Sequence, residues 1–185
     1  MSTLHPGLEQ RLVRLEAESI IRAQCHRYCR ALDRVDEDLL RSVFHPDSTH
    51  EHGAFKGTSA EFCDYAMATV RALDWTQHFL SNVSIEIQGD AARVESYFLA
   101  FHRLNQGRPG SGVFHAHDLR QHEDVVIGGR YLDRFEYREG EWKIAHRQGI
   151  NEWESWTSVD PRCATLPKLR NPVFPSNLTQ MFSGE

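Results

Sequence analysis

Two polar residues far apart in the chain, Asp33 and His78, have the side chains needed for acid–base chemistry in an apolar setting. Asp33 continues an apolar face formed by Tyr28, Cys29 and Leu32, where a carboxylate is costly unless it has a partner. The alternatives are a capping or solvent-facing carboxylate and a histidine bonded to a backbone carbonyl. If instead the carboxylate binds one ring nitrogen, the other nitrogen is ready to accept a proton, which predicts a general base.

Other residues could line the same site. Tyr28 could donate a hydrogen bond to a substrate oxygen, and Arg130, which follows two glycines, could hold an anion. Arg130 could equally face outward and pair with a glutamate, since strand alternation places it opposite Phe135 and Tyr137. Further candidates for the wall of the site, each also suited to a core position, are His52, Tyr97, Tyr131 and His146.

Signals for metal or cofactor binding are weak. His115 and His117 could supply two metal ligands from one strand, but no third ligand is evident. The sequence contains no G-x-S-x-G, P-loop or G-x-G-x-x-G motif, which argues against a serine hydrolase and against nucleotide binding. Four cysteines without paired zinc-type spacing are expected to be reduced and structural: Cys25, Cys29, Cys63 and Cys163. We therefore expect neither a metal nor a cofactor.

Length and charge limit the classes of partner. The 185 residues fit one domain, expected to span residues 1–155 and to be followed by a tail, 156–185, that holds four of the seven prolines. Lys and Arg number 21 against 26 Asp and Glu, a net charge of −5, so no basic field attracts nucleic acid. The sequence has no signal peptide or membrane-spanning run, which predicts a cytoplasmic protein without a membrane partner.

Three helices are expected to come first and to carry the candidate carboxylate. Apolar spacing predicts a long helix from near Leu8, and Asp36 can cap a second, short helix that Pro46 stops. The third helix opens with a capping box formed by Thr58 and Glu61. The inner face of the second helix is expected to comprise Leu39, Leu40, Val43 and Phe44.

The remainder of the chain alternates with the period of strands. Hairpin turns are predicted at Gly89-Asp90 and Glu139-Gly140, and an exposed loop at 105–112 that could act as part of a lid. Extended segments are predicted at 48–55, 76–88, 92–104, 125–137 and 141–153. Helices followed by a meandering, strongly curved antiparallel sheet predict a cone-shaped α+β fold with a mostly apolar pocket.

Four motifs within about residues 10–155 carry a resemblance to a known family. They are Tyr28-x4-Asp33, Thr76-Gln77-His78-Phe79, Gly129-Arg130-Tyr131-x-Asp133-x-Phe135 and Gly140-x-Trp142-Lys143-Ile144. Together they resemble the SnoaL-like superfamily, which has the nuclear-transport-factor-like, or cystatin-like, cone. They are similar to motifs of its members scytalone dehydratase, bile acid 7α-dehydratase and hexachlorocyclohexane dehydrochlorinase.

The resemblance implies roles for individual residues. Asp33 and His78 match the Asp–His dyad of the dehydratases and the dehydrochlorinase, and Arg130 matches the active-site arginine of the dehydrochlorinase. Tyr28 matches a tyrosine that contacts the carbonyl or leaving group in the bile acid enzyme and in ketosteroid isomerase. His52 stands where ketosteroid isomerase has its aspartate base, which argues against isomerisation through that aspartate.

These matches imply a cofactor-free lyase that performs β-elimination. Its substrate would be an apolar cyclic carbonyl compound such as a steroid, a polyketide or an intermediate of aromatic degradation. An isomerase or cyclase using the same pocket remains an alternative, as does a non-catalytic β subunit of a ring-hydroxylating dioxygenase. The resemblance also implies a homo-oligomer, either a trimer or a dimer, in which the Pro-rich tail could strap neighbouring subunits.

Overall fold

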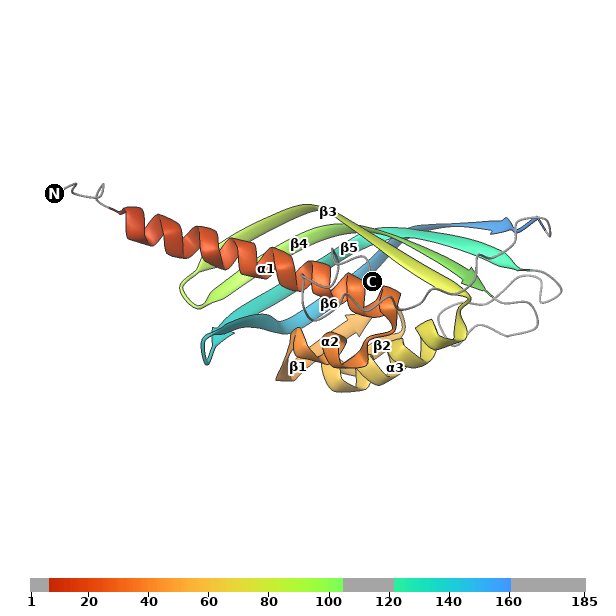
Figure 1. Ribbon diagram of the computed structural model, residues 1–185, viewed down its shortest axis with the longest axis horizontal. Helices are drawn as coiled ribbons and strands as arrows, with labels where there is room; N and C mark the ends of the chain where they lie inside the picture. The colour runs from red at the N-terminus through yellow and green to blue at the C-terminus, as the bar shows by residue number, and fades with distance from the viewer. Residues whose placement is uncertain (1–6, 105–121, 161–185) are drawn as a thin grey trace, which may run out of the picture.

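A computed structural model describes residues 7–104 and 122–160, which form three helices and one six-stranded sheet (Figure 1). The helices are α1 (Leu8–Arg34), α2 (Glu37–Ser42) and α3 (Ser59–Ala72). The strands are β1 (Phe44–His52), β2 (Phe55–Thr58), β3 (Trp75–Gln88), β4 (Ala91–Leu104), β5 (Glu123–Arg138) and β6 (Glu141–Ser158). The predicted α+β class is confirmed.

The helix starts follow the capping signals of the sequence. Leu39 donates its backbone N–H to Asp36 Oδ1 at 3.0 Å and so begins α2. At the start of α3, Glu61 donates its N–H to Thr58 Oγ1 at 3.2 Å, and Thr58 donates its N–H to Glu61 Oε2 at 2.8 Å. Short-range hydrogen bonds therefore fix where α2 and α3 begin, and both predicted caps are confirmed.

The predicted end of the second helix is wrong. Helix α2 stops at Ser42, and Phe44 belongs to β1 rather than to the inner face of the helix. Pro46 also lies in β1, within the stretch between Phe44 and Thr49 where the register with β6 is interrupted. A proline is tolerated there because no regular ladder requires its missing N–H.

The sheet has the strand order β2-β1-β6-β5-β4-β3, and all pairs are antiparallel except β1 with β6. Gly89 and Gly140 adopt positive φ at the two predicted hairpin turns. The last strand continues to Ser158, three residues beyond the predicted end of the domain at residue 155. The loop at 105–112 and the rest of the tail, from residue 161, lie outside the described residues.

The helices pack against one face of the sheet. Helix α1 runs along that face, and α2 and α3 lie beside its C-terminal half (Figure 1). Ile21, Leu40, Met67 and Ile144 are completely buried between these layers. One face of α1 and one face of the sheet are therefore turned toward each other, and the site lies between them.

No helix among the described residues has the length and apolar character needed to cross a membrane.

Candidate active site

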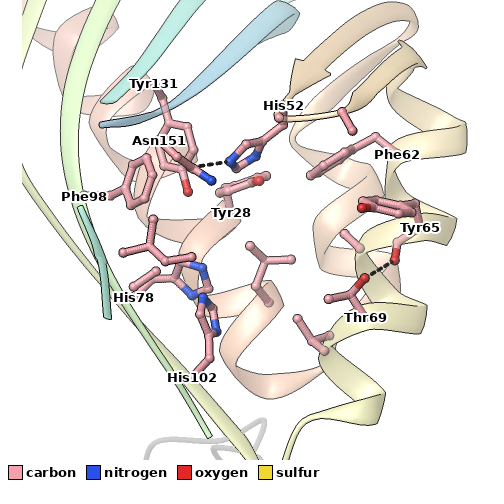
Figure 2. Close-up of a pocket in the computed structure, with 17 residues that line it drawn as sticks. Tyr28, His52, Phe62, Tyr65, Thr69, His78, Phe98, His102, Tyr131 and Asn151 are labelled. Atoms are coloured by element: carbon pink, nitrogen blue, oxygen red, sulfur yellow. Dashed lines mark hydrogen bonds between the residues drawn. The ribbon is translucent and has the colours of Figure 1, made fainter. Parts of the chain in front are cut away.

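A cavity of about 240 Å³ lies between α1, α3 and the inner face of the sheet (Figure 2). Most of its wall is apolar, with side chains such as Leu32, Val70, Phe98 and Ile127. The polar and aromatic side chains that reach the same space include Tyr28, His52, Tyr65, His78, His102, Tyr131 and Asn151. A few convergent polar groups in an apolar enclosure are typical of a small-molecule site.

Asp33 and His78 are in direct contact at this cavity. His78 Nδ1 lies 2.7 Å from Asp33 Oδ1, and the backbone N–H of His78 donates to both carboxylate oxygens at 3.0 and 3.1 Å. The side chains are 15% exposed for Asp33 and 6% for His78. The carboxylate comes from the last turn of α1 and the histidine from β3, so helix–sheet packing brings them together.

This geometry selects one arrangement of protons. An ionised carboxylate can only accept hydrogen bonds, so Nδ1 of His78 carries the hydrogen and Nε2 is the nitrogen that can accept a proton. The carboxylate also binds the backbone N–H of His78, so it fixes both the imidazole ring and this part of β3 relative to the end of α1. The arrangement can support a general base and stabilise the imidazolium that proton transfer produces.

A second histidine, His102 on β4, lies beside the pair and was not singled out by the sequence. Its ring centroid is 5.4 Å from that of His78 in an edge-on arrangement, and its Nδ1 lies 2.8 Å from Thr76 Oγ1. Burial, together with the nearby imidazoles of His78 and His52, lowers the pKa of His102 well below its usual value. His102 is therefore neutral near pH 7. The Gly89 turn could not have placed it here, because the β3–β4 register shifts by one residue between Ser81 and Ser84 before the strands reach His102.

Tyr28 and Tyr131 both line the cavity. Their rings enclose the guanidinium of Arg147, whose central carbon lies 4.0 Å from the centroid of Tyr28 and 4.4 Å from that of Tyr131. Burial raises the pKa of Tyr28 above its usual value, and the positive charge of Arg147 opposes that shift. Tyr28 therefore keeps its proton near pH 7 and can donate it in a hydrogen bond.

Arg147 is part of a buried ion pair that sequence reasoning missed. Its Nε and Nη2 lie 2.7 and 2.6 Å from the two carboxylate oxygens of Asp133, and both side chains are 0% exposed. A charge so deep is stable only with a partner of this bidentate kind. Asp133 belongs to a motif that carries the family resemblance, but nothing in the local sequence pairs it with Arg147 on the next strand.

His52 also lines the cavity and is oriented by Asn151. His52 Nε2 lies 3.0 Å from Asn151 Oδ1, and both side chains reach the cavity from neighbouring strands (Figure 2). The ring packs on Gly149, where a Cβ would come within 2.6 Å of His52 Cγ. Burial lowers the pKa of His52, which favours a neutral ring. Asn151 was not identified from the sequence, because amides on strands are common.

Three predicted site residues point away from the cavity, and their assignment to the site is wrong. Arg130 binds Glu152 at 2.6 Å and Glu95 at 3.2 Å on the outer face of the sheet, and Tyr97 lies beside its guanidinium. His146 bonds Thr49 at 2.8 Å on that same face. The irregularity between Gly128 and Gly129 does not turn Arg130 inward, because Tyr131, the next residue, takes the inward position.

No three His, Cys, Asp or Glu side chains gather as a metal site within residues 7–104 and 122–160. His115 and His117, the histidine pair considered from the sequence, lie outside these ranges. The thiols of Cys25, Cys29 and Cys63 are buried and free of disulfides. Burial raises the pKa of Cys25 to about 12, as it does for Cys29, and that of Cys63 to about 11, so these groups stay protonated and apolar.

Comparisons with known proteins give one family and several similar structures. The family model of the SnoaL-like domain matches residues 13–148. A hexachlorocyclohexane dehydrochlorinase superposes with a TM-score of 0.68 at 19% identity, over 85% of this chain and 98% of that chain. A candidate scytalone dehydratase from Novosphingobium aromaticivorans superposes with a TM-score of 0.62 at 23% identity, over 80% and 89% of the two chains.

A third structure, a protein with a cystatin-like fold from Nostoc punctiforme, has a TM-score of 0.55 at 18% identity, over 73% and 90% of the two chains. At these identities the structural likeness establishes the fold alone. No curated protein sequence matches this chain significantly.

Proposed function

Because this chain belongs to the SnoaL-like domain family, we propose that it is a lyase that removes water, or another small leaving group, from a cyclic carbonyl compound. The proposal rests on one observation, the Asp33–His78 contact at the wall of an apolar cavity. Names of structural neighbours that include a dehydratase and a dehydrochlorinase are consistent with it, since both names describe eliminations.

In the proposed reaction, Nε2 of His78 removes a proton from the carbon next to the carbonyl. The electrons of that C–H bond form a C=C bond as the C–O bond to the leaving hydroxyl breaks. The imidazolium, stabilised by Asp33 at 2.7 Å, returns its proton to the departing oxygen, which leaves as water. Tyr28 donates a hydrogen bond to the carbonyl oxygen as negative charge develops there.

The volume of the cavity limits the size of the substrate. A cavity of roughly 150 Å³ holds one benzene molecule, and the cavity here is about 240 Å³. A substrate of one or two fused rings fits this space better than a four-ring steroid. Apolar walls with Tyr28, His52 and Asn151 as polar contacts suit a mostly hydrocarbon ring system that carries one or two oxygens.

The proposal is tested with mono- and bicyclic β-hydroxy ketones, with the products identified by mass spectrometry. Loss of one water is expected, and a product of unchanged mass would instead indicate isomerisation. His78→Ala and Asp33→Asn should each lower the rate by about 10²–10⁴-fold, the usual contribution of a general base.

A second readout separates proton removal from departure of the leaving group. Ketones that lack the hydroxyl should exchange their α-protons for deuterium in heavy water in the presence of the wild-type protein. Arg130→Ala is the matched control, because Arg130 lies on the outer face and should leave both rates unchanged. Wild-type exchange by His78→Ala would remove His78 from the mechanism.

A further inference from the structure

Two histidines of the cavity wall have hydrogen-bond partners of different chemical kinds. His78 binds the carboxylate of Asp33, which can only accept hydrogen bonds, so the ring hydrogen of His78 stays on Nδ1. His52 instead binds the amide of Asn151, with Nε2 of the ring 3.0 Å from Oδ1 of the amide. An amide can accept through its oxygen or donate through its N–H groups. The partner of His78 therefore fixes its tautomer, whereas the partner of His52 does not.

The pair of His52 and Asn151 has two arrangements with one hydrogen bond each. In the first, Nε2–H of His52 donates to Oδ1 of Asn151, and the amide N–H groups are left to bind an acceptor. In the second, the amide is rotated by half a turn, its N–H donates to Nε2, and the ring hydrogen lies on Nδ1. The amide oxygen is then left to bind a donor. Neither arrangement changes the charge of the pair, so it can offer a donor or an acceptor to a ligand.

The ring of His52 is held in place while its tautomer changes. A Cβ on Gly149 would lie 2.6, 2.7 and 2.8 Å from Cγ, Nδ1 and Cδ2 of the ring, so the ring packs directly on the backbone of β6. Phe62 lies nearly parallel to it at 6.3 Å between centroids, and Tyr131 lies edge-on at 6.0 Å. Burial lowers the pKa of His52, which keeps the ring neutral and leaves it one hydrogen to place. A change of tautomer therefore moves this hydrogen and the amide of Asn151, but not the ring.

The pair lies apart from the proposed base. Figure 2 shows His52 and Asn151 at one end of the cavity and His78 at the other, with Tyr28 between them. A substrate whose reacting carbon meets His78 and whose carbonyl oxygen meets Tyr28 would extend its ring system toward the pair. A purely apolar group at that end would leave the free amide atoms of Asn151 without a partner, which is unfavourable once water is displaced. A polar substituent fits this end of the cavity better.

We infer that His52 and Asn151 form a binding site for a second oxygen of the substrate, which the pair can contact as a donor or as an acceptor. The inference rests on the proposed function for the position of the reacting carbon. It deepens that function by naming the substrate class, a ring ketone with a further hydroxyl or ketone oxygen at the end remote from His78. In this site Asn151 determines specificity, and His52 is a positioning residue that adjusts its tautomer to the amide.

Binding of substituted indanones, which are bicyclic ketones, tests the second-oxygen site by calorimetry. The substituent is placed on the ring carbon farthest from the carbonyl, and no probe carries a hydroxyl that could be eliminated. A methoxy group only accepts a hydrogen bond, whereas an aromatic amino group mainly donates one. Methoxyindanone should bind about 2–10-fold tighter than ethylindanone, and aminoindanone about 2–10-fold tighter than methylindanone, which are apolar counterparts of similar size. Equal affinities within both pairs of probes would overturn the inference.

Nitrogen NMR shifts of the histidine rings report the tautomers directly. With methoxyindanone bound, His52 should carry its hydrogen on Nε2, and with aminoindanone bound it should carry it on Nδ1. His78 is the internal control, because Asp33 should keep its hydrogen on Nδ1 with either probe. A single tautomer of His52 in both complexes would show that the pair does not adapt to its ligand.

Asn151→Asp gives His52 a partner that can only accept, like the partner of His78. It should lower the affinity for methoxyindanone relative to aminoindanone by about 10-fold, because the acceptor-only probe then faces a carboxylate. Gln88→Glu is the matched control, since it makes the same chemical change at the exposed end of β3 and should keep the wild-type ratio. An unaltered ratio in Asn151→Asp would remove Asn151 from the site.

The binding assays and the elimination assay fail independently of each other. A wild-type chain that prefers the polar probes but removes no water from β-hydroxy ketones would refute the lyase and leave the second-oxygen site intact. A chain that removes water but shows no preference for the polar probes would refute the second-oxygen site and leave the lyase intact.

Discussion

The buried pair of Asp133 and Arg147 should be the most sensitive point of the fold. We consider Asp133→Asn, which keeps the size of the side chain and removes its charge. Arginine is effectively always protonated, so the variant leaves a guanidinium with 0% exposure and no counter-charge. Replacement of one partner of a buried pair destabilises a protein by about 3–5 kcal/mol, a large part of the usual 5–15 kcal/mol.

This loss corresponds to a large change in thermal stability. For a chain of this length, each kcal/mol lowers the melting temperature by about 2–4 °C, so a decrease of about 6–20 °C is expected. Urea unfolding followed by circular dichroism measures the free energy directly. Because Arg147 also packs between Tyr28 and Tyr131, the variant should loosen one wall of the cavity as well.

Two controls make the result interpretable. Glu86→Gln removes a carboxylate paired with Arg93 at 2.7 Å, but both side chains are more than half exposed, so its effect should stay below about 1 kcal/mol. Replacing both buried partners together, Asp133→Leu with Arg147→Met, should destabilise less than Asp133→Asn alone, because no unpaired charge remains. A loss below about 1 kcal/mol for Asp133→Asn would refute the assignment of a tightly coupled buried pair.

Two further stability predictions rest on single positions. Burial, assisted by the charge of Arg147, lowers the pKa of His50 well below its usual 6.5. The unfolded chain therefore takes up a proton below pH 6.5 that the folded chain does not, so folding stability falls as the pH drops. From pH 7.5 to 5.5 this group removes about 1.4 kcal/mol, which His50→Phe should restore; an unaltered pH profile of urea unfolding would contradict this. Gly129→Ala should destabilise by about 2–3 kcal/mol and Gly128→Ala by less than 1 kcal/mol. A Cβ on Gly129 would lie 2.0 Å from the backbone oxygen of Ile150, whereas one on Gly128 meets only the side chain of Trp153, which can swing into solvent. Equal losses of free energy in urea titrations would show that this difference in neighbours does not matter.

Local sequence signals were sufficient to locate most of the helices and strands. The caps at Asp36 and Thr58 and the turns at Gly89 and Gly140 act over a few residues, so their positions can be read directly from residue types. There are two exceptions. The single extended segment expected at 48–55 is replaced by two strands, β1 and β2, which pair as a hairpin. At Phe44 apolar spacing suggested more helix, yet pairing with Ile144 on the distant strand β6 makes it extended. Tertiary pairing there overrides the local preference.

The candidate site was predictable only in part, for a physical reason. The costly carboxylate at Asp33 required a partner, and His78 was the candidate that the sequence offered. Arg130 was misplaced because a strand sequence gives alternation but not which face meets the helices, and its ion pair with Glu152 depends on that choice. The sequence around Arg147 and Asn151 does not indicate a role for either residue. Each acts with a partner on another strand, Asp133 for Arg147 and His52 for Asn151.

The sequence by itself determined the order of helices and strands, the α+β class and the two residue types suited to proton transfer, because these depend on local propensity and spacing. Only the tertiary structure decided which residues share the cavity, since that follows from the register between strands and from the face of the sheet on which α1 packs. Successive side chains of a strand point to opposite faces, so the packing of α1 on one face decides that Tyr131 lines the cavity and that Arg130, its neighbour, does not.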